Sequence, residues 1–174
     1  ADISSDGNVL FFSFYPGDLD SDQLSGHLND DLDVYYSVKP FVQAKKHALS
    51  EDQWSEGGAM MAGSDIYYMS NRNHLDNYDL YKNGQIIINT PTQSEQDPHF
   101  CLAKDELYFE VAGLIYVYKN NQITALPFPI NNDSQNRQPF LTLDCQTIYF
   151  ASTRGDGVFK IFKSERLDEN SWLP

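Results

Sequence analysis

The residues best suited to metal chemistry lie in one acidic stretch near the start of the chain. Asp18, Asp20 and Asp22 have the i, i+2, i+4 spacing of the oxygen ligands in a calcium-binding loop. However, Gln23 stands where such a loop needs Gly, and Asn29 stands where it needs Glu. We therefore expect a solvated acidic loop and no cofactor, with calcium at these carboxylates as the alternative.

Catalytic signatures are missing from the sequence. The histidines, His27, His47, His74 and His99, do not have the spacing of metal ligands. There is no Gly-x-Ser-x-Gly elbow, no local Cys-His signature and no phosphate-binding loop. With 25 acidic residues, no glycosidase pair can be chosen without knowing the separation of the carboxylates. We therefore predict that the chain is not an enzyme.

The charge balance excludes two classes of partner. The net charge is −13, which argues against nucleic acid and against an anionic membrane surface, because both attract basic proteins. No apolar run approaches the roughly 18 residues of a membrane-spanning helix. The first residues, Ala1-Asp2, carry no signal peptide and fit either a mature end after export or an artificial boundary.

A short β-branched and aromatic motif recurs four times, as Leu10-Phe11-Phe12, Ile66-Tyr67-Tyr68, Leu107-Tyr108-Phe109 and Ile148-Tyr149-Phe150. The last two steps are 41 residues each, and the first is 56. Such a period, with four short strands in each repeat, predicts the blades of a β-propeller. We predict an all-β, single domain over residues 1–174 with four-stranded antiparallel blades at about 1–57, 58–96, 97–137 and 138–174. They form a closed four-bladed ring or part of a larger one.

The central strand of each repeat is apolar on both faces. In the last repeat, Ile148 and Phe150 point to one side of the strand and Tyr149 and Ala151 to the other. A strand of this kind must be covered on both faces, as it is in a blade between two neighbouring blades.

The last repeat also resembles a known family. The stretches 138–144, 148–154, 160–164 and 171–172 are similar to the WD40-like repeat of the TolB propeller family, and Ser5–Ser13 and Ile66–Arg72 match it in the earlier repeats. Cys145 stands where the motif has Gly, and the third repeat lacks the Ser-x-Arg element. The resemblance implies an exported propeller, periplasmic or extracellular, that binds another protein.

One face of the predicted propeller collects the longer polar loops, which carry function more often than strands do. These are the insertion Phe14–Asp31, the predicted loops Asn71–Asn77 and Thr153–Gly157, and the connections between repeats. We predict that this face recognises the partner. The candidate residues, including one on a strand that lines the central channel (His99), are Asp18, Asp20, Asp22, Arg72, His74, Asp76, His99, Arg137, Arg154 and Asp156.

Two other functions stay open. Trp54 and Trp172, together with the Asn- and Asp-rich loops, are compatible with a glycan-binding or glycan-processing propeller, although packing at a blade edge is the favoured interpretation for each Trp. The chain is also compatible with a partial ring that is completed by further blades or by a second chain.

The two cysteines lie in different settings. Cys101 falls within a predicted first strand, and Cys145 falls in the turn after one. We expect one buried thiol and one exposed thiol, with a disulfide as the alternative.

Overall fold

The computed structural model describes residues 1–4, 6–14, 32–51 and 53–174. In these residues the regular secondary structure consists of fifteen β-strands, with no helix. They form two compact units, Ala1–Pro91 (the N-terminal unit) and Thr92–Pro174 (the C-terminal unit). Each unit contains two antiparallel sheets, in which strands that follow one another in the chain are paired.

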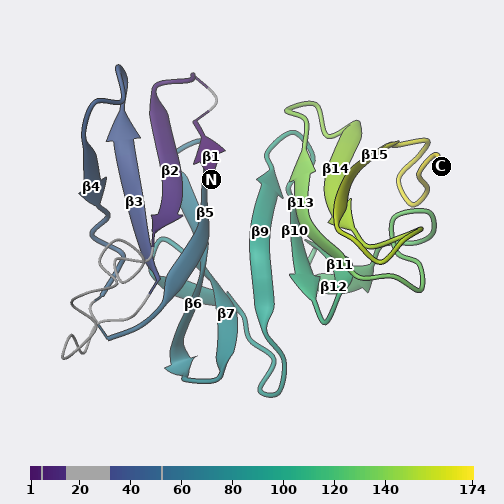
Figure 1. Cartoon of the computed structure of the whole chain (residues 1–174), viewed down its shortest axis with the longest axis horizontal. Helices are drawn as coiled ribbons and strands as arrows, with labels where there is room; N and C mark the ends of the chain where they lie inside the picture. Colours follow the sequence, from purple (N-terminus) through teal and green to yellow (C-terminus); the bar gives the residue numbers. More distant parts are fainter. Residues whose placement is uncertain (5, 15–31, 52) are drawn as a thin grey trace. The chain divides into compact units, whose positions relative to one another are not determined.

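The N-terminal unit holds blades 1 and 2, each a four-stranded meander (Figure 1). The strands of blade 1 are β1 (Asp2–Ile3), β2 (Val9–Phe14), β3 (Asp33–Val38) and β4 (Ala44–Lys46). Those of blade 2 are β5 (Glu56–Ala62), β6 (Asp65–His74), β7 (Asn77–Lys82) and β8 (Gln85–Ile88).

The C-terminal unit holds blades 3 and 4. The strands of blade 3 are β9 (Glu95–Cys101), β10 (Glu106–Val111), β11 (Leu114–Lys119) and β12 (Gln122–Ala125). Those of blade 4 are β13 (Asn136–Leu141), β14 (Thr147–Ser152) and β15 (Lys160–Glu165). A single bridge between Arg166 and Trp172 stands in the place of a fourth strand. The all-β fold and the blade topology predicted from the sequence are therefore confirmed.

The prediction of a loop at Asn71–Asn77 is wrong. Strand β6 continues through His74, and His74 pairs with Asn77 across a tight hairpin. The polar composition of this stretch signals exposure rather than irregular backbone, because a hairpin that projects from a sheet has solvent on both sides.

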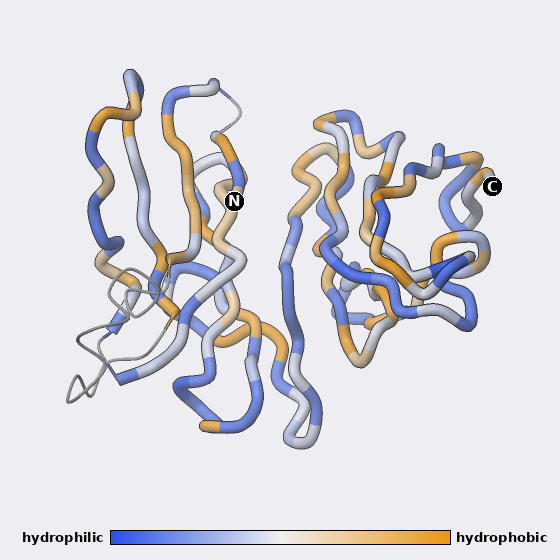
Figure 2. Tube along the Cα trace, in the orientation of Figure 1, coloured by the Kyte–Doolittle hydropathy of each residue, from blue (hydrophilic) through white to orange (hydrophobic). Residues whose placement is uncertain are grey.

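The first strand of blades 2, 3 and 4 contains a bulge in the same place. Its residue with positive φ is Gly58 (59°), Asp97 (52°) or Gln138 (53°). In each case the register against the next strand shifts at this point. In blades 3 and 4 the next residue is a buried proline, Pro98 or Pro139, and a bulge is where a sheet tolerates proline. Strand β9 is drawn mostly blue in Figure 2 because polar residues precede and surround this bulge.

Each blade has two distinct faces. The B face carries a cross-strand pair of rings, with centroids 5.4 to 6.2 Å apart: Phe12–Tyr35, Tyr68–Tyr81, Phe109–Tyr116 and Phe150–Phe162. The A face is the opposite side of the sheet. It carries the residue that comes directly before the B-face ring on the second strand, which is Phe11 in blade 1, Tyr108 in blade 3 and Tyr149 in blade 4.

Within each unit, the A face of one blade packs on the B face of the next. Phe11 joins Tyr68 and Tyr81 in one buried cluster of the N-terminal unit. Tyr108 joins Ile148 and Phe150 in that of the C-terminal unit. Each aromatic side chain in these two clusters removes a large apolar area from water.

Candidate functional site

The Ser-x-Arg motif of blade 2 is part of the framework of the unit. Arg72 lies on β6 and donates to the Ser70 hydroxyl (3.2 Å), to Glu56 Oε1 (3.0 Å) and to the Leu49 carbonyl (2.8 Å). Its guanidinium also lies 5.1 Å from the centre of the Tyr81 ring. Burial raises the pKa of Glu56, and the hydrogen bonds from Ser70 and Arg72 oppose that rise. Arg72 therefore joins the end of β6 to the start of β5 and to the segment that leads into it.

Arg154 repeats this arrangement in blade 4, with an amide in place of the carboxylate. It donates to the Ser152 hydroxyl (3.0 Å) and to Asn136 Oδ1 (3.0 Å), and also to the carbonyls of Pro129 (2.9 Å) and Ile130 (2.6 Å). Its guanidinium lies 4.8 Å from the centre of the Phe150 ring. The partner-binding role of Arg72 and Arg154 stays a prediction, and these contacts give both residues a structural role.

We predict that Arg154→Lys lowers the free energy of unfolding by about 2 kcal/mol, because Lys cannot bridge the two carbonyls and the amide at once. The measurement is urea denaturation followed by Trp172 fluorescence in a Trp54→Phe background. Arg137→Lys is the matched control, since Arg137 is exposed, and it should change stability by less than about 0.5 kcal/mol. Equal effects of the two variants would contradict the structural role.

The other predicted site residues are scattered over the two units. In the N-terminal unit, His74 and Asp76 lie at the β6–β7 hairpin. In the C-terminal unit, Arg137 lies over the Phe159 ring (5.0 Å), and the exposed Asp156 pairs with Lys160 (2.5 Å). The proposed calcium ligands Asp18, Asp20 and Asp22 lie outside the described residues.

His99 is a buried part of the blade 3–blade 4 joint. Its Nε2 is 3.2 Å from the Leu141 carbonyl, and its ring centre is 4.7 Å from that of Phe140. Burial lowers the pKa of His99 to about 4, so the ring is neutral near pH 7. The ring therefore serves as a hydrogen-bonded, uncharged part of the joint, and its predicted role in partner binding stays a prediction.

A pocket of about 410 Å³ lies within the C-terminal unit, over the outer part of the A face of blade 3. Strands β10, β11 and β12 form one wall, and the segment 166–172 forms the other. The residues that line the pocket include Glu106, Tyr108, Val117, Lys119, Thr124, Leu126, Pro127, Arg166, Glu169 and Trp172.

A buried ionic cluster centred on Glu106 lies at this pocket. Glu106 Oε1 accepts from Lys119 Nζ (3.0 Å), and Oε2 accepts from Tyr108 (2.5 Å) and from Arg166 (2.8 Å). The side chains of Glu106 and Arg166 are only 3% and 4% exposed. Arg166 also donates to the Tyr108 hydroxyl and to the Cys145 carbonyl, and it lies 4.6 Å from the centre of the Trp172 ring.

These contacts fix the ionisation of the cluster. Burial alone would raise the pKa of Glu106, but the hydrogen bonds from Tyr108, Arg166 and Lys119 outweigh it and hold the pKa below its usual value. Burial and the hydrogen bond to Glu106 raise the pKa of Tyr108 well above its usual value. Glu106 is therefore an anion with both oxygens occupied, which is unsuited to accept a proton from a substrate.

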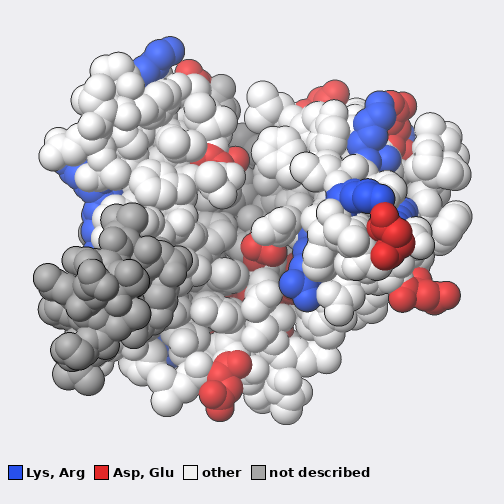
Figure 3. All heavy atoms as spheres, viewed as in Figure 1, with Lys and Arg blue, Asp and Glu red and all other residues white. Residues whose placement is uncertain are grey.

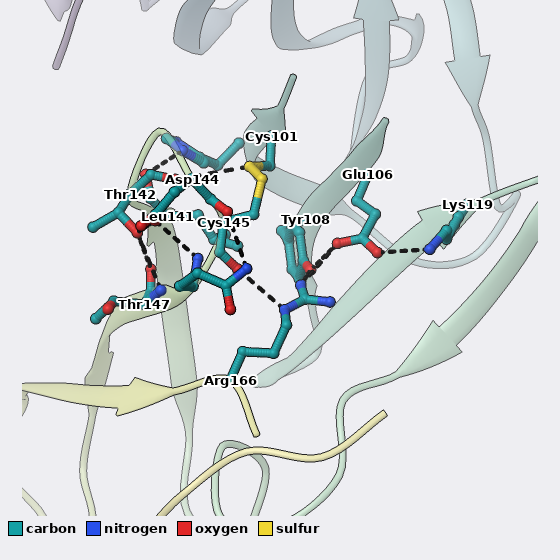
Figure 4. Close-up of a disulfide and its surroundings, with 12 residues drawn as sticks. Cys101, Glu106, Tyr108, Lys119, Leu141, Thr142, Asp144, Cys145, Thr147 and Arg166 are labelled. Atoms are coloured by element: carbon teal, nitrogen blue, oxygen red, sulfur yellow. Dashed lines mark hydrogen bonds and ion pairs between the residues drawn. A yellow bond between two sulfur atoms is a disulfide. The ribbon is translucent and has the colours of Figure 1, made fainter. Parts of the chain in front are cut away.

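The expectation of two separate thiols is wrong, because Cys101 and Cys145 form a disulfide (Figure 4). Cys101 ends β9 of blade 3, and Cys145 lies in the turn between β13 and β14 of blade 4. Both are buried, at 3% and 0% exposure. Burial of a turn residue was unexpected. It arises because the turn packs against blade 3, and the Cys145 carbonyl accepts a hydrogen bond from Arg166. The disulfide thus joins the two blades beside the Glu106 cluster.

Two kinds of site are not found in the described part of the chain. No group of three or more His, Cys, Asp or Glu side chains in it is placed to hold a metal ion. None of its segments forms a helix of the length and hydrophobicity needed to cross a membrane.

Comparison with known proteins identifies the fold. No protein-family model matches the sequence, and no curated protein is significantly similar to it. Among solved structures, the chain is similar to the crystal structure of TolB from Acinetobacter baumannii, with a TM-score of 0.54 and 15% sequence identity over 92% of this chain. The fold is that of a TolB-like propeller. This confirms the resemblance seen in the repeats. The TolB-like propeller described here spans 39% of the length of that TolB chain.

The ionic cluster centred on Glu106 could not be predicted from the sequence of this TolB-like propeller. Glu106 and Arg166 are 60 residues apart and belong to no motif. The one available signal was Trp172, whose predicted packing role is confirmed by its 5% exposure.

Proposed function

We propose that this chain is a non-catalytic, protein-binding propeller module of a bacterial protein exported to the periplasm or cell envelope. The fold similarity to TolB supports a propeller interaction module. The observation that carries the proposal is the position of the pocket, which opens beside an exposed edge strand, β12.

Strand β12 is suited to pair with an extended peptide. It is the outermost strand of its sheet, and all four of its residues are exposed. The edge of a sheet presents main-chain N–H and C=O groups, and a peptide that adds to it gains affinity from the backbone and specificity from side-chain pockets. The pocket next to β12 supplies one such subsite.

The chemistry of the pocket indicates what this subsite accepts. Arg166 forms an ion pair with Glu106, and Lys119 contacts both Glu106 and Glu169 (3.3 Å from Lys119 Nζ to Glu169 Oε2). The two positive and two negative charges of the cluster therefore neutralise one another. Figure 3 shows the same tendency at the surface of the C-terminal unit, where basic side chains lie beside acidic ones. The remaining wall includes Val117, Leu126 and Pro127. We infer that an uncharged, apolar side chain of the partner enters here.

The same cluster weighs against glycan binding in this pocket. A sugar-binding platform needs an aromatic ring with an open face. Trp172 is 5% exposed, and Arg166 lies over it. Tyr108 is 1% exposed and hydrogen-bonded to Glu106. Neither ring is free to stack on a sugar.

A pocket-filling substitution tests the proposal. Thr124 and Ile123 are adjacent, exposed residues of β12 whose side chains point to opposite faces, and only Thr124 lines the pocket. We predict that Thr124→Trp abolishes capture of the partner from a bacterial envelope extract, while Ile123→Trp retains it. The measurement is quantitative mass spectrometry of proteins captured by the wild type and by the two variants.

Circular dichroism of both variants controls for folding. Equal capture by Thr124→Trp and Ile123→Trp would exclude the pocket as the binding site. Absence of any specifically captured protein with the wild type would contradict the protein-binding function itself.

A further inference from the structure

The backbone pairing of β12 can be followed residue by residue. The Leu126 N–H donates to the Ile115 carbonyl (2.9 Å), and these two residues lie opposite one another when the β11–β12 register is extended by one position. In an antiparallel ladder, opposed residues alternate between hydrogen-bonded and non-hydrogen-bonded pairs. Counting back along β12, the residues that make no backbone bond to β11 are therefore Ala125 and Ile123.

The hairpin between β11 and β12 gives the same alternation. Asn120 and Asn121 have positive φ (52° and 62°), as the two central residues of a type I′ turn do. The residues on either side of such a turn, here Lys119 and Gln122, form a hydrogen-bonded pair. Counting forward from this pair, Ile123 again makes no bond to β11. Its N–H and C=O groups therefore point to the free edge of the sheet.

Side chains on the A face give the pocket two different ends. Val117 and Thr124 face one another in one row, on the side of the buried Leu126. Lys119 and Gln122 face one another in the next row, two residues away along each strand. Both rows line the pocket. An extended chain beside β12 places one side chain at each row, because alternate side chains of a strand point to the same face.

We propose that β12 pairs in antiparallel orientation with a peptide segment of a partner protein, which places an apolar residue opposite Thr124 and an uncharged polar residue opposite Gln122. The inference rests on the proposed function and specifies the chemistry of its partner. Antiparallel pairing is favoured because it is the more stable ladder per residue. Since β12 runs from Gln122 toward Thr124, the partner segment reads apolar-x-polar from its N-terminus to its C-terminus.

The apolar preference follows from the pairing. Thr124 and the peptide residue opposite it form a non-hydrogen-bonded pair, in which the side chains lie closest. A long apolar side chain at this position reaches across Thr124 toward Val117 and Leu126 and is removed from water.

The polar preference follows from the charges at the other end. Lys119 is already paired with Glu106 (3.0 Å) and Glu169 (3.3 Å), so a charged peptide side chain would have to compete with these ion pairs. The exposed amide of Gln122 offers both a donor and an acceptor, which an uncharged polar side chain can use.

Two synthetic peptides of the same composition test the order of the two residues. The forward probe is acetyl-Thr-Thr-Leu-Thr-Gln-Thr-Thr-amide, and the reversed probe exchanges Leu and Gln. Fluorescence anisotropy of the labelled probes with the whole chain should show about three- to fivefold tighter binding of the forward probe. The reversed probe can bring its Leu opposite Thr124 only by losing the contact with Gln122. Equal affinities, tighter binding of the reversed probe, or no binding of either would overturn the proposal.

N-methylation of the forward probe tests the backbone pairing without altering the protein. The Thr between Leu and Gln is opposite Ile123, so its N–H faces β12, whereas the N–H of Leu points away. A methyl group on the nitrogen of this Thr should weaken binding at least about tenfold, because it removes a hydrogen bond and obstructs the edge. The matched control is a methyl group on the Leu nitrogen, which should change the affinity less than about twofold. Equal effects of the two methyl groups would exclude this register.

The protein offers a corresponding pair of variants at Ala125. Ala125→Pro removes an N–H that faces the free edge, where a strand tolerates proline. Ala125→Val has a side chain of similar size and keeps the N–H. The Pro variant should bind the forward probe at least about tenfold more weakly than the Val variant. Equal binding by the two variants, with circular dichroism showing both folded, would overturn the pairing.

Capture from the envelope extract separates this proposal from the proposed function. If Thr124→Trp abolishes capture while Ala125→Pro captures as well as Ala125→Val, partner binding stands and the edge pairing falls. If the wild type captures no protein, the proposed function falls and this inference with it. Sedimentation tests a different occupant: a dimer of the wild type that Ala125→Pro dissociates would show that β12 pairs with a second copy, and would overturn the proposal.

Discussion

Replacing Glu106 with Gln is expected to lower the free energy of unfolding of the C-terminal unit by about 3–5 kcal/mol, the cost typical of leaving one member of a buried ion pair without its partner. The side chain of Arg166 is 4% exposed and cannot recover the loss from water. The amide of Gln retains the shape of the carboxylate but carries no charge. The main cost is therefore the uncompensated guanidinium rather than a cavity.

The same variant has a characteristic pH dependence. Because the pKa of Glu106 in the folded protein is below its ordinary value of 4.5, its contribution is complete above that pH and is lost as the pH falls through the folded pKa. The difference in stability between the wild type and Glu106→Gln should be constant near neutral pH and should narrow below about pH 4.5. Urea denaturation at several pH values, with Trp172 as the single tryptophan, measures it.

Two further variants control for this interpretation. Glu169→Gln removes an exposed member of the same network (68% exposed) and should cost less than about 1 kcal/mol. The double variant Glu106→Gln/Arg166→Met should be more stable than Glu106→Gln alone, because it removes the stranded charge. If Glu106→Gln and Glu169→Gln had equal effects, Glu106 would not be the centre of the cluster.

Removing the disulfide is expected to lower the stability of the same unit by about 4 kcal/mol, through the unfolded state. The bond closes a loop with a sequence separation of 44, and the chain-entropy estimate for a loop of this length is about 4 kcal/mol. Alanine is the appropriate replacement, because Cys101 and Cys145 are 3% and 0% exposed and a serine would bury two hydroxyl groups.

The measurement compares urea denaturation of the wild type, the wild type with a reducing agent, and Cys101→Ala/Cys145→Ala. Reduction and substitution should give similar losses of stability. A loss below about 1 kcal/mol for both would contradict the expectation and would show that the Glu106 cluster holds blades 3 and 4 together without the bond.

Residue patterns within one repeat proved informative. The recurring aromatic strands predicted the blades, since alternation along a strand depends only on neighbouring residues. The polar stretch Asn71–Asn77 was wrongly predicted to be a loop. Polar composition indicates exposure to solvent, and a projecting hairpin is as exposed as a loop. The structural role of Arg72 and Arg154 could not be predicted, because backbone carbonyls bind them, such as those of Leu49 and Ile130, and the side-chain types of a sequence do not reveal such carbonyls.

Contacts between repeats were beyond the reach of the sequence. Cys101 and Cys145 pair although they occupy different positions in their repeats, so the repeat pattern gives no reason to join them. The pocket depends on Glu106 of one blade and Arg166 of the next, each an ordinary charged residue in its own repeat. A site formed by residues of two neighbouring blades can be recognised only when the structure shows how those blades pack together.

The bulge at Gly58, Asp97 and Gln138 bears on how such a chain evolves. Because the bulge and its two-faced sheet belong wholly to a single repeat of about 41 residues in blades 2, 3 and 4, each of these copies brings its own local geometry and both of its contact surfaces. An in-frame duplication or deletion of one such segment leaves the remaining copies intact. Selection can therefore lengthen or shorten the array in whole modules.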